Sequence, residues 1–334
     1  MRFGPVPLSD AQGAILAHSL HAGEARLRKG QVLDAQALAQ LAAAGLTEVV
    51  VAQPGPDDVA EDMAAARLAA ALVPEEAAAK LSRAAPFTGR ANLHATAAGL
   101  ALIDRAAVDA VNAVDPAITL ATLPPFARVA PGLLVATAKM IPYAVREPAL
   151  AAACACAAGA VRVAPFRLRD AGLVLTRVPG QPARLNEKGT AAVEARLAGL
   201  GMRLAGVREV AHDIAPLAGA LRDLPGAVLL ILTGSATADV ADTGPAAVVA
   251  AGGRIVRFGM PVDPGNLLFL GDLGGRPVIG LPGSARSPVP HGADWVLERI
   301  ACGLEVTPDA IAAMGVGGLL KEIPARPQPR ERRR

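Results

Sequence analysis

The sequence has few aromatic residues and no long hydrophobic run. Aromatic residues make up 2% of its 334 residues, so alanine, valine and leucine must fill the interior. No apolar run reaches the roughly 18–20 residues that a helix needs to cross a membrane. The N-terminal residues also lack the apolar core and cleavage site of a signal peptide. We therefore expect a cytoplasmic protein with no membrane partner.

Cysteine is also scarce, which argues against a zinc centre. Cys154 and Cys156 lie in an alanine-rich segment that favours helix, and Cys302 stands alone. A structural zinc site needs a second pair of ligands, and no such pair is present. We expect all three cysteines to be buried thiols, which pack as small apolar residues.

Positive charge is concentrated in the C-terminal tail. The formal net charge is +3, and the last nine residues, RPQPRERRR, contribute +4 through five arginines and one glutamate, which leaves −1 for the rest. A near-neutral body lacks the electrostatic surface of a nucleic-acid-binding protein. We expect no nucleic-acid partner. A short tail rich in proline and arginine is predicted to be disordered, and contact with phosphates or a membrane surface is the alternative.

Changes in sequence texture suggest three regions. Residues 1–163 are predicted to form a mixed α/β N-terminal region, either as one unit or as two small subdomains. Residues 164–304 alternate short apolar runs with helical patterns, and residues 305–334 are predicted to be a helix followed by the basic tail. Candidate strands at 172–176, 204–210, 227–232, 254–259 and 277–282 alternate with candidate helices at 187–200, 214–223, 243–251 and 288–303.

This alternation predicts an α/β fold with a doubly wound, mainly parallel sheet. In such sheets ligands bind beyond the carboxyl ends of the strands. The loops that follow Thr176, Val210, Leu232 and Leu281 should therefore gather on one rim of the sheet.

The loop after residue 232 carries small and hydroxyl-bearing residues, Thr233-Gly234-Ser235-Ala236-Thr237, and a helix is expected to begin near Asp242. Helix N-termini present unpaired amides that favour anions, so the loop is a candidate phosphate-binding site. A capped turn without a ligand explains it equally well. Asp239 and Asp242 have two interpretations: either Asp242 caps the helix and Asp239 is solvated, or the pair binds a hard cation such as Mg²⁺.

A second candidate loop is Gly283-Ser284-Ala285-Arg286-Ser287, which again lies between a predicted strand and a predicted helix. An arginine can bind phosphate through two parallel hydrogen bonds, while a surface salt bridge is the alternative for Arg286. The preceding residues 258–278 contain several prolines and glycines and are predicted to form a rigid loop able to close over a ligand.

Two further residues complete the predicted rim. Asn186 is expected at the start of a helix, either as its cap or as a ligand contact. Asp213 follows a strand and opens a helix, and His212 beside it is either structural or a ligand or base. No Ser-His-Asp nucleophile motif, phosphate-loop lysine motif or dinucleotide fingerprint is found.

The order of these elements resembles the molybdopterin-binding domain of the MoeA/MogA/gephyrin family. Asn186, Asp213, the T-G-S loop with Asp242, then M-P-V-D-P-G-N and G-L-P-G-S follow one another as in that family, over about residues 165–304, and the chain is most similar to stand-alone MoeA-like proteins. The resemblance implies a MogA-like fold, a homo-oligomer, and molybdopterin or molybdenum cofactor as the ligand.

The resemblance also assigns roles to residues. It implies cofactor contacts by Asn186, Thr233, Gly234, Ser235, Gly283 and Ser284. Thr237, Arg286 and Ser287 are further candidate contacts, because they lie on the same two loops. The resemblance implies roles in molybdate insertion for Asp213 and Asp242, with Mg²⁺ as a candidate cofactor, while Asp242 and Asp239 are the candidate metal ligands from their own spacing. The implied partners are a molybdoenzyme or a cofactor nucleotidyltransferase.

The chain departs from the family pattern at the first predicted strand of this region. The family has an acidic residue there, whereas this sequence has Arg177 and Val178; Ser235 replaces a loop glycine, and GSARSP stands for G-N-P. Such changes affect catalysis more than binding. We expect molybdopterin binding in cofactor biosynthesis, with molybdate insertion of the molybdenumtransferase kind as a further step. The alternatives are a non-catalytic cofactor carrier for a molybdoenzyme and a regulatory nucleotide-binding α/β module.

Overall fold

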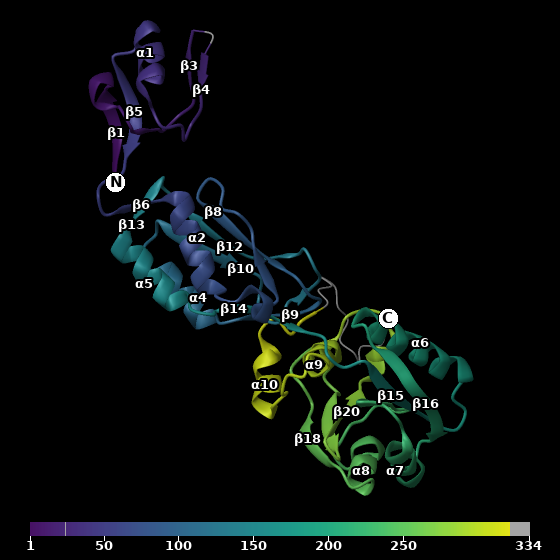
Figure 1. Ribbon diagram of the computed structural model, residues 1–334. Coiled ribbons are helices and arrows are strands. Elements are labelled where there is room, and N and C mark those ends of the chain that lie inside the picture. The colour runs from purple at the N-terminus through teal and green to yellow at the C-terminus, as the bar shows by residue number, and fades with distance from the viewer. Residues whose placement is uncertain (24, 321–334) are drawn as a thin grey trace, which may run out of the picture. The chain divides into compact units, whose positions relative to one another are not determined.

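The structure is a computed structural model that describes residues 1–23 and 25–320 (Figure 1). Backbone contacts divide the chain into two compact units, Met1–Pro165 and Phe166–Arg334. The predicted basic tail lies outside the described residues. A separate C-terminal region from residue 305 stays a prediction.

The N-terminal unit begins with a small α/β part. Its elements are β1 (Arg2–Pro7), β2 (Ile15–Leu16), β3 (Leu20–Ala22), β4 (Ala25–Leu27), α1 (Ala35–Ala43) and β5 (Glu48–Gln53). Strand β5 lies between β1 and β2 in an antiparallel sheet. The side chain of Asp34 caps α1 by accepting from Ala37 N at 2.8 Å, and Gly45, with a φ of +81°, follows the helix.

Small antiparallel sheets and helices form the rest of this unit. They are β6 (Asp58–Ala60), α2 (Glu61–Leu72), α3 (Glu76–Ala79), β7 (Leu81–Arg83), β8 (Arg90–Ala95), β9 (Gly99–Ile103), α4 (Arg105–Val114), β10 (Ile118–Thr122), β11 (Arg128–Val129), β12 (Leu134–Met140), β13 (Ala144–Arg146), α5 (Glu147–Ala157) and β14 (Val161–Pro165). Strands β10, β12, β8 and β7 form one sheet and β11, β9 and β14 another. Its core consists of alanine, valine and leucine with one methionine and one isoleucine, as the scarcity of aromatics predicts.

The cysteine prediction is correct only in part. Cys302 is buried, but Cys154 and Cys156 on α5 are half-buried. Helix α5 is rich in alanine on every side, so its sequence does not mark which face is covered.

The C-terminal unit contains a six-stranded sheet. Its elements are β15 (Asp170–Arg177), α6 (Ala183–Gly199), β16 (Arg203–Ala211), α7 (Ile214–Asp223), β17 (Val228–Leu232), α8 (Thr243–Ala250), β18 (Arg254–Phe258), β19 (Phe269–Leu273), β20 (Arg276–Leu281), α9 (Gly292–Ala301) and α10 (Pro308–Ala312). The strand order is β16-β15-β17-β20-β19-β18. The first four strands are parallel and the last two antiparallel. The mixed α/β class is confirmed, with a mixed and mostly parallel sheet.

The antiparallel edge corrects one prediction. Residues 258–278 were expected to form a single rigid loop, yet Phe269–Leu273 forms strand β19, which pairs with β20 through the turn at Gly274 and Gly275. Both glycines have positive φ, of 61° and 82°, which a tight hairpin requires. The loop between β18 and β19 is therefore limited to residues 259–268.

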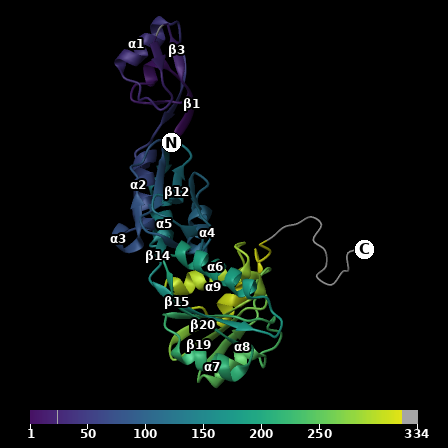
Figure 2. The ribbon, with the colours of Figure 1, turned by 90° about the vertical axis from the view of Figure 1, so that its right-hand side faces the viewer.

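Helices cover both faces of this sheet. Helices α7 and α8 lie on one face and α6 and α9 on the other, as the two views show (Figures 1 and 2). Val174, Leu229 and Ile231 pack with α7 and α8 in one hydrophobic cluster. Strand β17 is buried at every residue, which explains why it is a continuous apolar run.

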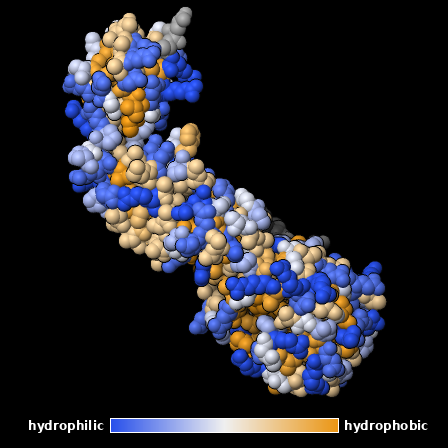
Figure 3. All heavy atoms as spheres, in the orientation of Figure 1, coloured by the Kyte–Doolittle hydropathy of each residue, from blue (hydrophilic) through white to orange (hydrophobic). Residues whose placement is uncertain are grey.

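Among residues 1–23 and 25–320, no helix combines the length and the hydropathy needed to cross a bilayer. Hydrophilic and hydrophobic residues are interspersed over the face of the C-terminal unit that Figure 3 shows.

Candidate functional site

Loops that follow the parallel strands meet at the carboxyl end of the sheet, as predicted. Thr176, the buried penultimate residue of β15, accepts a hydrogen bond from Gly234 N at 2.7 Å and shares another with His212 Nδ1 at 2.8 Å. Arg286, after β20, donates from Nη2 to Thr233 O at 2.8 Å. These contacts join the end of β15 to the segments that follow β16, β17 and β20. We call this edge of the sheet the rim. These contacts also give His212 a structural role.

The loop after β17 is packed closely against the end of β15. A Cβ at Gly234 would lie 2.9 Å from Thr176 O and 3.1 Å from Val178 N, so a larger residue does not fit without a shift. The Thr233 hydroxyl donates to Ser235 O at 2.6 Å, and Thr237 is buried, whereas Ser235 is exposed. The predicted donors Thr233 Oγ1 and Gly234 N are thus already used within the protein.

The two aspartates of this loop accept hydrogen bonds from backbone amides. Asp242 is the N-cap of α8 and accepts from Thr243 N at 2.7 Å and from Ala238 N at 3.0 Å. Asp239 is exposed and accepts from Ala241 N at 2.8 Å. The capping interpretation of Asp242 is confirmed. Within the described residues no group of three histidine, cysteine or acidic side chains is placed to hold a metal ion.

The loop after β20 contains buried polar atoms that lack partners. Residues Gly283–Arg286 form a 3-10 turn. Within the part of the chain that the structure describes, Ser284 Oγ and Arg286 Nε are buried and have no hydrogen-bond partner. Buried polar groups in folded proteins are nearly always paired, so two neighbouring exceptions on a rim indicate a place for a ligand.

The charge of Arg286 is not neutralised by the described protein. Burial lowers the pKa of its guanidinium, and no described carboxylate forms a salt bridge with it. The alternative interpretation of Arg286, as a partner in a surface salt bridge, is therefore wrong for the described residues. A half-buried cation that donates to one carbonyl and keeps its Nε free suits an anion with several acceptor oxygens, such as phosphate.

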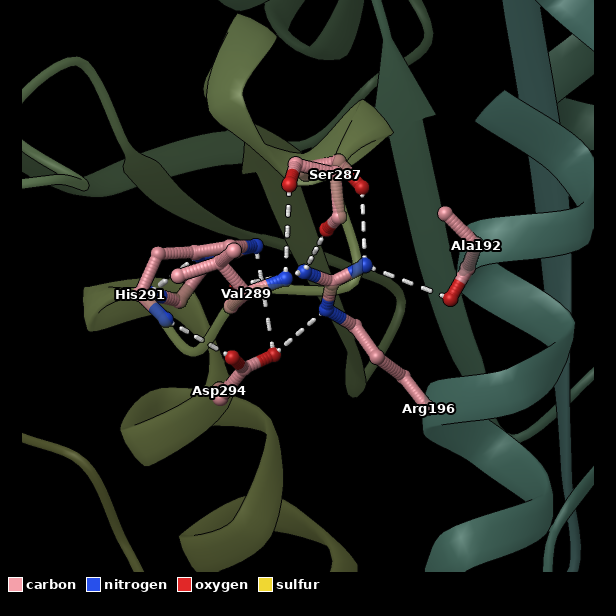
Figure 4. Close-up of polar contacts among 8 residues, drawn as sticks. Ala192, Arg196, Ser287, Val289, His291 and Asp294 are labelled. Atoms are coloured by element: carbon pink, nitrogen blue, oxygen red, sulfur yellow. Dashed lines mark hydrogen bonds and ion pairs between the residues drawn. The ribbon is translucent and has the colours of Figure 1, made fainter. Parts of the chain in front are cut away.

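An arginine that the sequence did not single out holds this loop (Figure 4). Arg196 on α6 donates from Nε to Asp294 Oδ1 at 2.7 Å and from Nη1 to Ala285 O at 2.7 Å. Its Nη2 donates to the carbonyl oxygens of Ser287 and Val289. Nothing in the local pattern marks Arg196, because its contacts lie about a hundred residues further along the chain.

His291 lies beside this arginine and begins α9. It is 1% exposed, and its Nδ1 accepts from Ala293 N at 3.2 Å. Asp294 returns a bond by accepting from His291 N at 2.9 Å, which completes a reciprocal cap. Burial lowers the pKa of His291 to about 4. The positive charge of Arg196 also lowers this pKa, and the negative charge of Asp294 raises it by less than burial lowers it. The imidazole is therefore neutral at pH 7.

Asn186 lies inside α6 and does not cap it. The helix begins at Ala183, after its N-cap Pro182, so the predicted cap position was four residues late. Asn186 is 2% exposed, and its side chain accepts from Gln181 Nε2 at 2.9 Å and donates to Glu209 Oε2 at 3.0 Å. Both ends of this amide are thus used inside the protein, which leaves little capacity for the predicted ligand contact.

Glu209 supplies a carboxylate beside Arg177, at the end of the strand where the family has an acidic residue and this chain has none. It comes from β16 and forms a salt bridge with Arg177 at the end of β15. Asp213 occupies the N-cap position of α7, but it is exposed and its side chain makes no capping bond. No described hydrogen bond or ion pair joins Asp213 to Asp242. The structure brings Thr233, Ser284 and Arg286 into one region of the rim and does not link the two proposed catalytic aspartates.

Comparisons with known proteins give limited matches. Residues 5–53 match the model of a family described as a domain of unknown function, DUF8806. No curated protein matches the chain. Among solved structures, the chain is similar to the molybdopterin biosynthesis MoeA protein from Pyrococcus horikosii, with 16% identity over 91% of this chain and 76% of that one, and a TM-score of 0.30. At that TM-score the similarity is distant and carries no functional argument.

Proposed function

We propose that the rim binds molybdopterin through its phosphate group and that the chain acts as a cofactor-binding protein. The observation that carries this proposal is the pair of unpartnered buried donors, Ser284 Oγ and Arg286 Nε, next to an uncompensated positive charge. Phosphate oxygens accept hydrogen bonds and carry the opposite charge. The resemblance of the rim motifs to molybdopterin-binding domains supports a phosphate-bearing pterin as the ligand.

The predicted phosphate contacts are revised by their hydrogen bonding. Thr233 Oγ1 donates within its own loop and Gly234 N is bound to Thr176, so neither is a free donor. We assign the phosphate contact to Ser284 and Arg286. The loop after β17 contacts this site, because Thr233 O accepts a hydrogen bond from Arg286 Nη2.

The hydrogen bonds of Asp239 and Asp242 favour cofactor binding alone over binding followed by metal insertion. Asp242 already accepts two backbone amides and Asp239 accepts one, so their oxygens are engaged in capping. Mg²⁺ prefers several free oxygen ligands, and this pair does not offer them. We therefore propose a carrier that passes the pterin to a molybdoenzyme or a cofactor nucleotidyltransferase.

Titration of the purified full-length chain with molybdopterin under anaerobic conditions tests this proposal. We expect Arg286→Gln to weaken binding at least 10-fold, because a hydrogen bond to a charged group contributes about 1.5–3 kcal/mol. Arg276→Gln is the matched control. Arg276 is also half-buried and donates to one carbonyl, Leu224 O at 2.8 Å, but it lies at the opposite end of β20.

The outcomes separate the alternatives. Equal affinity of wild type and Arg286→Gln, or no binding by the wild type, would contradict the proposal. Tighter binding of ATP or GTP than of molybdopterin would favour the nucleotide-binding alternative. Recovery of molybdenum cofactor after incubation with molybdate would show insertion and would overturn the carrier role.

A further inference from the structure

The loop between β20 and α9 has few backbone hydrogen bonds of its own. Its 3-10 turn is held by Ala285 N donating to Pro282 O and by Ser287 N donating to Ser284 O. Beyond Ser287, prolines at positions 288 and 290 have no amide hydrogen, and Val289 N reaches only the Ser287 hydroxyl, at 3.4 Å. The conformation of residues 285–289 therefore depends on groups outside the loop.

Arg196 supplies those groups. Its guanidinium donates to the carbonyl oxygens of residues 285, 287 and 289, from the end of the 3-10 turn into the segment that follows it. The remaining donors reach Asp294 Oδ1 at 2.7 Å and Ala192 O at 3.2 Å. The Arg196 side chain is 11% exposed. One planar fork with five donors thus ties α6, the loop and the first turn of α9 together.

Two of the carbonyls that Arg196 binds belong to the chain neighbours of Arg286. We propose that Arg196 is a positioning residue, which fixes the backbone on both sides of Arg286 and so directs the Arg286 guanidinium toward the ligand. The inference rests on the proposed function of the same rim. It goes further by assigning ligand affinity to a residue that does not touch the ligand.

Lysine at position 196 separates positioning from general stability. Arg196→Lys keeps the charge opposite Asp294, but one ammonium group cannot reach the carbonyls of residues 285, 287 and 289 together. In the ligand-free full-length chain we expect amide hydrogen exchange of the peptide 283–291 to rise at least 10-fold. Exchange in β17 should not change. We also expect faster labelling of Arg286 by phenylglyoxal, measured by mass spectrometry. Arg276→Lys is the control and should change neither.

Ligand affinity provides the second readout. We expect Arg196→Lys to weaken molybdopterin binding about 10-fold and to have no further effect in an Arg286→Gln background, because Arg196 acts through Arg286. A merely structural role would weaken both backgrounds equally, and such an additive result would overturn the inference. Unchanged exchange and labelling in Arg196→Lys would overturn it as well.

If Arg196→Lys does not fold, the wild type alone decides: the amides of Ser287 and His291 should exchange at least 100-fold more slowly than in a free peptide, and free-peptide rates would overturn the inference. If the wild type binds no molybdopterin, the proposed function fails. The exchange and labelling results, which need no ligand, still decide whether Arg196 places Arg286.

Discussion

Two loops on the rim reach a fixed conformation in different ways. The loop after β17 holds itself, because Thr233 donates to Ser235 O and both aspartates accept amides of the same loop. The loop after β20 is held mainly by Arg196 from α6, which binds three of its carbonyls. Both leave neighbouring parallel strands of one sheet. A self-capped loop can therefore be recognised from its own residues, whereas a loop held by a residue far along the chain cannot.

Removal of the Arg196 donors should have the largest effect on the second loop. Arg196→Met keeps the packing volume but leaves Asp294, 19% exposed, without its ion pair and three carbonyls without donors. We expect the free energy of unfolding of the C-terminal unit to fall by about 3–5 kcal/mol. Trp295 is the one tryptophan of the chain and lies on α9, so its fluorescence in a urea titration reports this unit.

The control for this variant is Arg276→Met, which removes a single bond to a backbone carbonyl. It should lower the free energy of unfolding by about 1 kcal/mol. Equal losses in the two variants would show that the loop after β20 does not depend on Arg196 in the way the hydrogen bonds indicate.

The pH dependence of stability tests the same network through His291. Burial lowers the pKa of His291 from 6.5 to about 4, so between these values the unfolded chain binds a proton that the folded chain does not. This contribution to stability is fully present above pH 6.5 and is lost as the pH falls toward 4. The shift corresponds to about 3 kcal/mol between wild type and a variant that does not titrate.

His291→Asn is that variant, because asparagine also caps helices and keeps an acceptor for Ala293 N. Urea unfolding followed by Trp295 fluorescence at pH 7, 6, 5 and 4 should show a steeper loss in the wild type than in His291→Asn. Parallel curves for the two proteins would contradict the assignment of this pH window to His291.

The sequence was informative where structure depends on neighbours along the chain. Buried β17 is a continuous apolar run, and Asp242 is followed by a helix, so both were predicted correctly. Strand β19 was missed because its glycine and aspartate resemble loop residues, and its pairing with β20 is visible only once the turn is formed.

The candidate site shows the same limit. Ser284 and Arg286 were singled out from their place between a strand and a helix, but the lack of a partner for either buried atom is a property of the folded chain. Arg196 and Asp294 are 98 positions apart, so no local pattern could join them. Asn186 was placed at a cap because the predicted helix, 187–200, begins four residues after the true start of α6.

One added methyl group should disrupt the close packing of the loop after β17 against the end of β15. Gly234→Ala would place a Cβ near two backbone atoms of β15 and its following loop, at 2.9 and 3.1 Å, which backbone cannot easily relieve. We expect a loss of about 2 kcal/mol in the free energy of unfolding. Gly219→Ala is the control: a Cβ there meets nothing within 4 Å, and alanine in a helix should be neutral or stabilise by up to about 1 kcal/mol. A smaller loss for Gly234→Ala than for Gly219→Ala would contradict the packing.

The smallest effect is expected at the cap of the same loop. Asp242→Ala removes the acceptor of Thr243 N and Ala238 N and should lower the free energy of unfolding by about 1 kcal/mol, whereas Asp242→Asn keeps a good cap and should lose much less. Both variants should bind molybdopterin with an affinity close to that of the wild type, because the ligand contact is assigned to Ser284 and Arg286. A loss of binding in Asp242→Asn at unchanged stability would place this aspartate in the ligand site and would make the self-capped loop, rather than the loop held by Arg196, the one that contacts the ligand.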